Sequence, residues 1–127
     1  IKYQIDAKLN IYGSKKEIES AFLNLITNAI RYTKEDGFIS ISWGLINGLP
    51  IFEVRDTGSG IEQKHINKIT ERFYRVDVDR SRDNGGTGLG LSIVKNIIRQ
   101  HDGELKITSE AGKGSSFKLI FNKESIT

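Results

Sequence analysis

The chain has 127 residues, of which 37% are hydrophobic and 28% are charged, a composition typical of one globular domain with a hydrophobic core. No apolar run is long enough to cross a bilayer, and the absence of cysteine excludes a disulfide framework or a thiolate metal site. The net charge of +3 comes from 19 basic and 16 acidic residues that are interleaved, so we expect a mixed solvated surface rather than a nucleic-acid site.

Two elements are predicted in the first 32 residues. Residues 1–5 alternate between apolar and polar as in a strand, and because the sequence starts inside this pattern and without Met, we expect the natural chain to continue upstream. Ser14 and Glu17 have the spacing of a capping box, the start signal of a helix. The sequence therefore predicts a helix over residues 14–32. Its apolar residues recur at helical spacing and are Ile18, Phe22, Leu25, Ile26, Ala29 and Ile30.

A β-hairpin is predicted next. Apolar residues alternate with small polar ones over residues 39–45, as in a half-buried strand. The pair Asn47-Gly48 then predicts a tight turn, because both residues tolerate a positive φ. A second strand is predicted over residues 51–55. It ends at Asp56, and the two glycines at positions 58 and 60 allow either a turn or the close approach of a ligand to the backbone.

A long irregular segment separates the hairpin from a second helix. Residues 61–84 are rich in charge, with a short helical stretch predicted over residues 63–69, and they lead into a glycine-rich run at residues 85–90. Gly103 is predicted to end the second helix as a left-handed cap. The apolar stripe of this helix consists of Leu89, Ile93, Val94, Ile97 and Ile98.

Two strands complete the pattern, over residues 105–109 and 116–121, around a glycine-containing turn. Because strands and helices are segregated, the predicted fold class is α+β. We expect a two-layer α/β sandwich in which helices cover one face of a mixed, mostly antiparallel sheet. Residues 1–127 are expected to form a single domain.

One face of the first helix carries three polar side chains. Asn24, Asn28 and Arg31 are spaced by four and three residues, so they lie on the same side of the helix, beside the apolar stripe. Carboxamide oxygens can bind a hard cation, and a guanidinium group can hold phosphate oxygens. This equipment suits a nucleotide with Mg²⁺, although a plain solvated face explains the same pattern.

Two further segments can contribute to a nucleotide site. Asp56 can accept a hydrogen bond from the amino group of a base, but an ordinary Asx turn has the same residues. Gly86, Gly88 and Gly90 open the second helix, where unpaired backbone N–H groups bind phosphate well. The spacing excludes a GxGxxG motif, because Leu91 stands at the third glycine position, and no GK[ST] sequence of a P-loop is present.

In combination, these segments resemble the nucleotide-binding boxes of histidine kinases, in the order of that family. The N box corresponds to residues 24–33, the G1 box to residues 56–61, the F box region to residues 71–77 and the G2 box to residues 86–91. The four boxes cover nearly the whole chain. The F box region and the residues after it are most similar to phosphate-regulon sensor kinases of proteobacteria.

The resemblance implies the Bergerat ATP-binding fold, which histidine kinases share with Hsp90, type II topoisomerases and the mismatch-repair ATPases. It implies ATP and Mg²⁺ as cofactors, with Asn28 as the main Mg²⁺ ligand, Asn24 assisting and Arg31 reaching phosphate. These three are the implied catalytic residues. The resemblance also implies that Tyr32 packs by the adenine and that Asp56 reads the adenine amino group.

The implied site extends to glycines and to a mobile ATP lid over residues 61–87. Gly58 and Gly60 are expected to shape the base pocket, and Gly86, Gly88 and Gly90 to close over the triphosphate. The other implied nucleotide-binding residues are Ile61, Phe73, Tyr74, Arg75, Arg82, Thr87, Leu89 and Leu91.

Three positions depart from the family pattern. Thr70 stands where the F box usually opens with an aromatic residue, Glu62 where a proline often follows the G1 box, and Asp102 where the first of two glycines usually stands. None of these is expected to abolish nucleotide binding.

The residue four positions before Asn28 separates phosphoryl transfer from hydrolysis. The hydrolysing branch of the superfamily resembles Glu-x-x-x-Asn, but here Asn24 replaces the glutamate, and a neutral carboxamide cannot act as a general base. This favours a protein-histidine kinase over an ATPase. Neither His65 nor His101 has the surroundings of the family's phosphoacceptor. We therefore expect the acceptor on a histidine-bearing dimerisation domain of the same kinase, which then passes the phosphoryl group to a response regulator.

Two alternatives share this fold. One is a module that uses ATP only to regulate interactions, which the intact Asn28, Asp56 and G2 glycines argue against. The other is an anti-sigma-factor kinase with a serine substrate, and residues 73–75 favour the histidine kinase over it. The resemblance implies a cytoplasmic domain, without direct membrane or nucleic-acid contact, in a two-component signalling protein anchored in the bacterial inner membrane.

Overall fold

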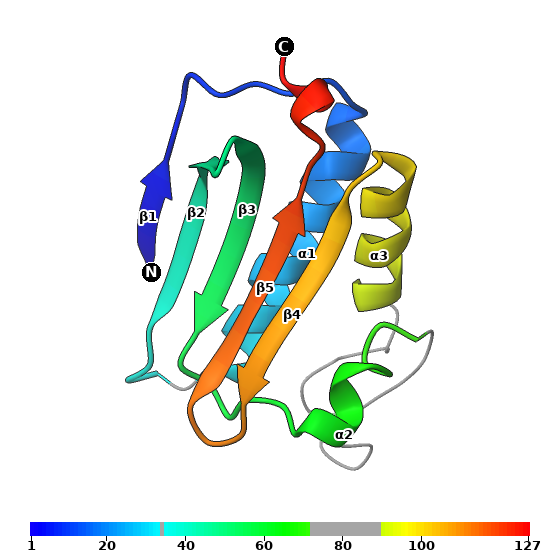
Figure 1. Ribbon diagram of the computed structural model, residues 1–127. Helices are drawn as coiled ribbons and strands as arrows, with labels where there is room; N and C mark the ends of the chain where they lie inside the picture. The colour runs from blue at the N-terminus through cyan, green and yellow to red at the C-terminus, as the bar shows by residue number, and fades with distance from the viewer. Residues whose placement is uncertain (34, 72–89) are drawn as a thin grey trace.

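A computed structural model describes residues 1–33, 35–71 and 90–127 (Figure 1). The predicted bounds of the first helix and of the last four strands agree with the structure within two residues. The elements are β1 (Lys2–Ile5), α1 (Lys15–Tyr32), β2 (Ile39–Ile46), β3 (Leu49–Asp56), α2 (Gln63–Ile66), α3 (Gly90–Gln100), β4 (Glu104–Glu110), β5 (Gly114–Ile120) and a 3-10 turn at Lys123–Ser125.

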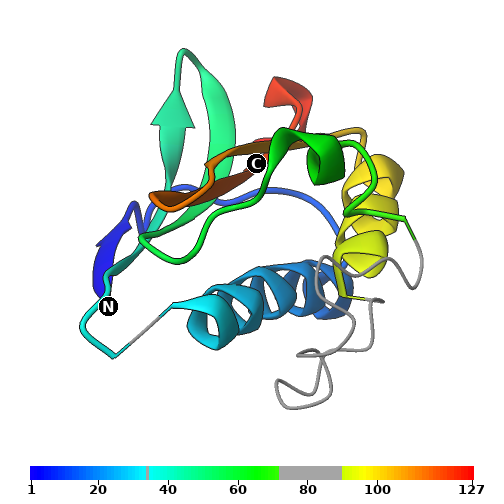
Figure 2. The same ribbon diagram turned by 90° about the horizontal axis from the view of Figure 1, so that it is seen from below.

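The strands of the described residues form one sheet in the order β1-β2-β3-β5-β4. β1 runs parallel to β2, and the other neighbouring strands pair antiparallel. Figure 2 shows α1 and α3 lying along the same face of this sheet. The predicted α+β two-layer sandwich is confirmed. No helix among the described residues has the length and apolar character needed to cross a membrane.

The turn between β2 and β3 forms for the reason that the sequence indicates. Asn47 and Gly48 adopt φ values of 53° and 82°. Both lie in the left-handed region, which a two-residue hairpin turn requires.

An aromatic cluster fixes α1 against the sheet. The ring of Phe22 in α1 stacks on Phe52 in β3, with centroids 3.8 Å apart and an interplanar angle of 3°. Trp43 of β2 and Phe121 meet edge to face at 5.8 Å beside this stack. Offset and edge-to-face aromatic pairs add to the stabilisation from burial alone. The buried apolar residues around the cluster include Ala21, Leu25, Ala29, Val54, Val94, Ile98, Phe117 and Leu119.

The capping box at the start of α1 is completed by a residue far along the chain. The N–H of Glu17 donates to Ser14 Oγ at 3.3 Å, as predicted, but the N–H of Ser14 donates to Nε2 of His101 at 3.1 Å. Nδ1 of His101 lies 2.8 Å from the carbonyl oxygen of Ile97, so Nδ1 carries the proton and Nε2 accepts. His101 therefore joins the start of α1 to the end of α3.

The end of α3 differs from the prediction. The left-handed residue is Asp102, with φ of 57°, and not Gly103. The N–H of Gly103 donates to Ile98 O at 2.8 Å and that of Asp102 to Arg99 O at 3.1 Å, which is a Schellman motif. Gly103 is required for a different reason, because a Cβ built on it would lie 2.6 Å from the carbonyl oxygen of Ile120.

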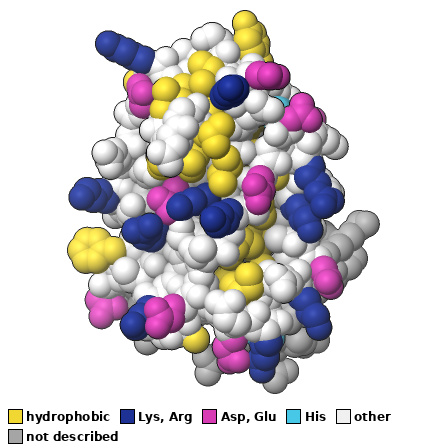
Figure 3. All heavy atoms as spheres, in the orientation of Figure 1, with side chains coloured by type: hydrophobic (Ala, Val, Ile, Leu, Met, Phe, Trp, Pro, Cys, Tyr) yellow, Lys and Arg dark blue, Asp and Glu magenta, His cyan; other side chains and the backbone are white. Residues whose placement is uncertain are grey.

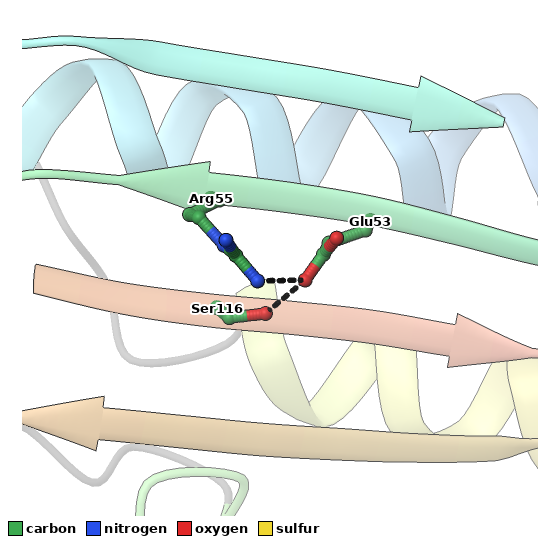
Figure 4. Close-up of polar contacts among 3 residues, drawn as sticks. All are labelled: Glu53, Arg55 and Ser116. Carbon is green, nitrogen blue, oxygen red and sulfur yellow. Dashed lines mark hydrogen bonds and ion pairs between the residues drawn. The ribbon is translucent and has the colours of Figure 1, made fainter. Parts of the chain in front are cut away.

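The outer face of the sheet carries charged side chains of both signs around a central band of apolar side chains (Figure 3). Figure 3 shows Lys and Arg interspersed with Asp and Glu on this face. Glu53 of β3 accepts hydrogen bonds from Ser116 Oγ at 2.5 Å and from Arg55 Nη2 at 3.4 Å (Figure 4). In this view the basic residues do not form a continuous stripe.

Gly103→Ala should lower the free energy of unfolding by about 1–3 kcal/mol, because the added methyl group overpacks the contact between the end of α3 and β5. Gly44→Ala is the matched control. There the nearest atom to the new Cβ is Asp6 Cβ at 3.9 Å, so the change should stay within about 1 kcal/mol. Urea unfolding of both variants measures the difference. Equal effects would show that close packing does not require glycine at position 103.

Candidate functional site

Four parts of the fold meet at one end of the molecule. The C-terminal ends of α1 and β3, the β4–β5 turn and the N-terminus of α3 all lie at the lower end of Figure 1. A Cβ built on Gly58 would lie 2.5 Å from the carbonyl oxygen of Tyr32, and one built on Gly90 would lie 3.3 Å from Oδ1 of Asn24. The loop after β3 and the start of α3 therefore both lie against α1, the helix that carries the predicted polar face.

The helix itself fixes the orientation of the Asn24 side chain. Nδ2 of Asn24 donates to the carbonyl oxygen of Ser20, one turn earlier, at 2.8 Å. Oδ1 is then the atom that faces Gly90 at the start of α3. Asn28 and Arg31 follow one and two turns later on α1, and both are partly buried. All three predicted catalytic residues thus lie on the half of α1 nearest this end of the sheet.

Asp56 is the last residue of β3, and its side chain is buried, with 7% of the residue exposed. Its Oδ1 accepts the N–H of Gly58 at 2.8 Å, which is the Asx-type turn that the sequence offered as an alternative. Burial raises the pKa of Asp56 above its ordinary value, against smaller lowering effects from the N–H groups of Gly58 and Ser115. A buried carboxyl with a raised pKa, beside a loop, is characteristic of ligand sites.

Thr33 carries a buried hydroxyl in the same region of the described structure. Oγ1 of Thr33 is buried and has no hydrogen-bond partner among the described residues. Thr33 follows Tyr32 directly at the end of α1, where the loop after β3 makes its closest approach. Leaving a buried hydroxyl unpaired costs free energy that a bound ligand can recover. Sequence reasoning did not select Thr33, because burial without a partner is visible only in the structure.

The donor atoms in this region suit Mg²⁺. Among the described residues, no group of three or more His, Cys, Asp or Glu side chains could hold a metal ion. A metal held beside α1 could use the carboxamide oxygens of Asn24 and Asn28, together with phosphate oxygens and water. Mg²⁺ is usually held by few protein oxygens plus substrate phosphates. The Asn24 oxygen that faces Gly90 fits such a role.

Some of the remaining predicted site residues lie within the described ranges, and the others lie outside them. Ile61 is 9% exposed and belongs to the core, Leu91 packs against that core in the first turn of α3, and Tyr32 is 45% exposed. Gly60 adopts a φ of 72° beside the β4–β5 turn. Only residues 61–71 of the predicted lid are described. The predicted residues outside the described ranges are Phe73, Tyr74, Arg75, Arg82, Gly86, Thr87, Gly88 and Leu89.

Residues 13–125 match the family described as histidine kinase-, DNA gyrase B-, and HSP90-like ATPase. The chain belongs to this ATPase family. This ATPase-family domain is 46% identical to the phosphate regulon sensor protein PhoR of Pseudomonas aeruginosa over 113 residues, which are 89% of this chain and 26% of that protein. It is 43% identical to the signal transduction histidine-protein kinase ArlS of Staphylococcus aureus over 124 residues, covering 94% of this chain and 28% of ArlS. The chain therefore spans about a quarter of the length of these relatives.

Solved structures show the same fold. The catalytic domain of histidine kinase ThkA is 28% identical with a TM-score of 0.78, covering 95% of this chain and 76% of that one. Full-length ShkA in complex with AMPPNP is 26% identical with a TM-score of 0.80, covering 94% of this chain and 24% of that one. The mycobacterial sensor histidine kinase MprB, at 22% identity and a TM-score of 0.79, shares the fold over 94% of this chain and 82% of that one. The prediction of a sensor histidine kinase catalytic domain is confirmed.

Asp56→Asn should raise the free energy of unfolding at neutral pH by about 0.5–2 kcal/mol, the range common for a single stabilising substitution. Because burial raises the pKa of the Asp56 carboxyl group in the folded protein, the folded state binds this proton more tightly than the unfolded chain does. Wild-type stability is then lost as the pH rises from the unfolded pKa, near 3.8, through the folded pKa. The asparagine variant has no such loss.

Chemical unfolding of both proteins across this pH interval tests the prediction, with Asp102→Asn, at an exposed left-handed position, as the matched control. The stability difference should shrink toward zero below the unfolded pKa. A variant less stable than wild type at neutral pH would contradict the account of Asp56.

Proposed function

We propose that this ATPase-family domain binds ATP with Mg²⁺ and transfers the γ-phosphoryl group to a histidine on a separate domain of the same kinase. The observation that carries the proposal is the meeting of two segments on one helix. The loop after Asp56 lies against the last turn of α1, and the start of α3 lies against Asn24 of the same helix. A nucleotide beside α1 would reach both segments.

The base would lie at the loop after β3. The carboxylate of Asp56 would accept a hydrogen bond from the adenine amino group, and Gly58 lets the loop after β3 lie directly against the end of α1, beside the proposed base. Thr33 supports this placement, because its buried hydroxyl has no partner among the described residues and lies next to the same loop. A base bound there would give the Thr33 hydroxyl a partner and would lie beside the buried Asp56 carboxylate.

The phosphates would lie at the start of α3. The first N–H groups of a helix have no partner within the helix, and the helix dipole favours negative charge there. Asn28, with Asn24 assisting, would hold Mg²⁺, and Arg31 would bind phosphate oxygens. When bound, the ion would neutralise charge on the triphosphate. AMPPNP in the structure of the relative ShkA supports a nucleotide in this kind of domain.

The Asn24 side chain supports transfer rather than hydrolysis. Its Nδ2 already donates to the backbone of Ser20, and its Oδ1 is a carboxamide oxygen, which is too weak a base to take a proton from water. In transfer, the bond from the γ-phosphorus to the β-phosphate oxygen breaks while a bond to the acceptor imidazole nitrogen forms, and ADP leaves. The acceptor must approach in line with the breaking bond.

The acceptor is proposed to lie on a histidine-bearing dimerisation domain of the same kinase. Both ring nitrogens of His101 are engaged, with Ser14 and with Ile97, so His101 is a poor nucleophile. The acceptor domain would then pass the phosphoryl group to a response regulator. We place the domain in the cytoplasm, where ATP is available, with the whole kinase anchored in the bacterial inner membrane. The identity to PhoR supports a place among the phosphate-regulon sensor kinases.

Mixing this chain with the dimerisation domain and labelled ATP–Mg²⁺ should label that added domain and leave this chain unlabelled. Asn28→Ala should lower the rate by at least about 10- to 100-fold, the loss typical of residues around a metal site. Asn96→Ala, on the exposed face of α3, is the matched control and should behave as wild type. Acid-labile phosphate on this chain alone would overturn the assignment of donor and acceptor to separate domains.

A further inference from the structure

The hairpin formed by β4 and β5 holds the loop after β3 from the side opposite α1. The N–H of Ile61 donates to Ser109 Oγ at 2.7 Å, and the N–H of Gly112 donates to the carbonyl oxygen of Ser59, also at 2.7 Å. Nε2 of Gln63 donates to the carbonyl oxygen of Ser109 at 3.3 Å. Three hydrogen bonds thus join this loop to a hairpin that is about 50 residues away along the chain.

The two segments are also in close contact at backbone level. A Cβ built on Gly60 would lie 2.1 Å from the carbonyl oxygen of Glu110, and one built on Gly114 would lie 2.1 Å from that of Asp56. Side chains at either glycine would push the hairpin off the loop. The loop is therefore held between the hairpin on one side and the end of α1 on the other.

The hydroxyl of Ser109 lies at the centre of this contact, and all of its hydrogen-bonding capacity is used. It donates its one proton to the carbonyl oxygen of Gly114 at 2.9 Å and accepts the N–H of Ile61. Oγ of Ser115 lies 2.8 Å away, and because the Ser109 proton is already used, Ser115 must be the donor. Ser109 therefore makes one donated and two accepted bonds, which alanine cannot make.

We propose that Ser109 is a positioning residue of the nucleotide site, an inference that rests on the proposed function. Through Ile61 it holds the loop that begins at Asp56, and through Ser115 it reaches the strand residue whose N–H bonds the Asp56 carboxyl. Ser109 sets where the base-binding groups stand relative to α1 and does not itself touch the nucleotide.

Removing the hydroxyl leaves the N–H of Ile61 without its partner on a residue that is 9% exposed. The loop can recover that bond only by moving, which displaces Asp56 and Gly58 from the base. Ser109→Ala should therefore weaken ADP binding about tenfold, the effect of one buried hydrogen bond. Discrimination between ADP and inosine diphosphate should narrow as well, because the two differ in the group that faces the carboxylate.

Calorimetry on the full chain measures the dissociation constants of both nucleotides for wild type, Ser109→Ala and Ser109→Thr. The threonine variant keeps the hydroxyl and should restore both affinity and discrimination. Ser116→Ala, which removes a hydroxyl from the outer face of the same sheet (Figure 4), is the matched control and should bind as wild type. Hydrogen exchange of wild type without nucleotide should show the Ile61 amide strongly protected.

The outcomes separate this inference from the function on which it rests. Wild type that binds ADP while the folded Ser109→Ala variant binds it equally well would overturn the role of Ser109 and leave the proposed function standing. If Ser109→Ala does not fold, rapid hydrogen exchange of the Ile61 amide in wild type would overturn the proposed role of Ser109 instead. Wild type that fails to bind ADP would remove the proposed function, and this inference with it.

Discussion

The carbonyl oxygen of Tyr32 lies so close to Gly58 that only a hydrogen atom fits between the end of α1 and the loop after β3. At the middle of α1, the stack of Phe22 on Phe52 fixes the same helix to the same strand. These two contacts determine how far Asp56, at the end of β3, stands from the polar face of α1. The nucleotide site depends on that spacing, because base and phosphates must reach both elements together.

The groups that the site uses are those that the fold leaves incomplete. Burial makes the charged form of Asp56 costly, Thr33 keeps a buried hydroxyl without a partner among the described residues, and the first N–H groups of α3, like those of any helix, have no partner within the helix itself. None of these features adds to the free energy of unfolding of the protein without nucleotide. Their grouping at one end of the sheet has a physical explanation if a nucleotide binds there. Because the chain belongs to an ATPase family, ATP is the nucleotide to expect.

Local patterns were enough to predict α1, the β2–β3 hairpin and the fold class, because these depend on hydrophobic period and on turn residues such as Asn47. The motifs also predicted that Asn24 and Asp56 belong to one site, which stays a prediction. What the sequence could not supply were contacts between distant segments. The bond from Ser14 to His101 spans 87 residues, and the role of Ser109 depends on a loop 48 residues earlier. The residues adjacent to these positions in the sequence show no pattern that predicts either contact.

The central claim is that nucleotide binds at the end of the fold where α1, β3 and α3 meet. Chemical-shift changes in a ¹⁵N spectrum, on addition of ADP with Mg²⁺, test it most directly. The account predicts the largest changes at the backbone amides of Gly58 and Gly90 and at the side-chain amide of Asn28, the last only when Mg²⁺ is present. The opposite end holds a cavity of about 380 Å³ lined by residues that include Tyr12 and His101. Changes centred on that cavity, with the α1 face unaffected, would contradict the account.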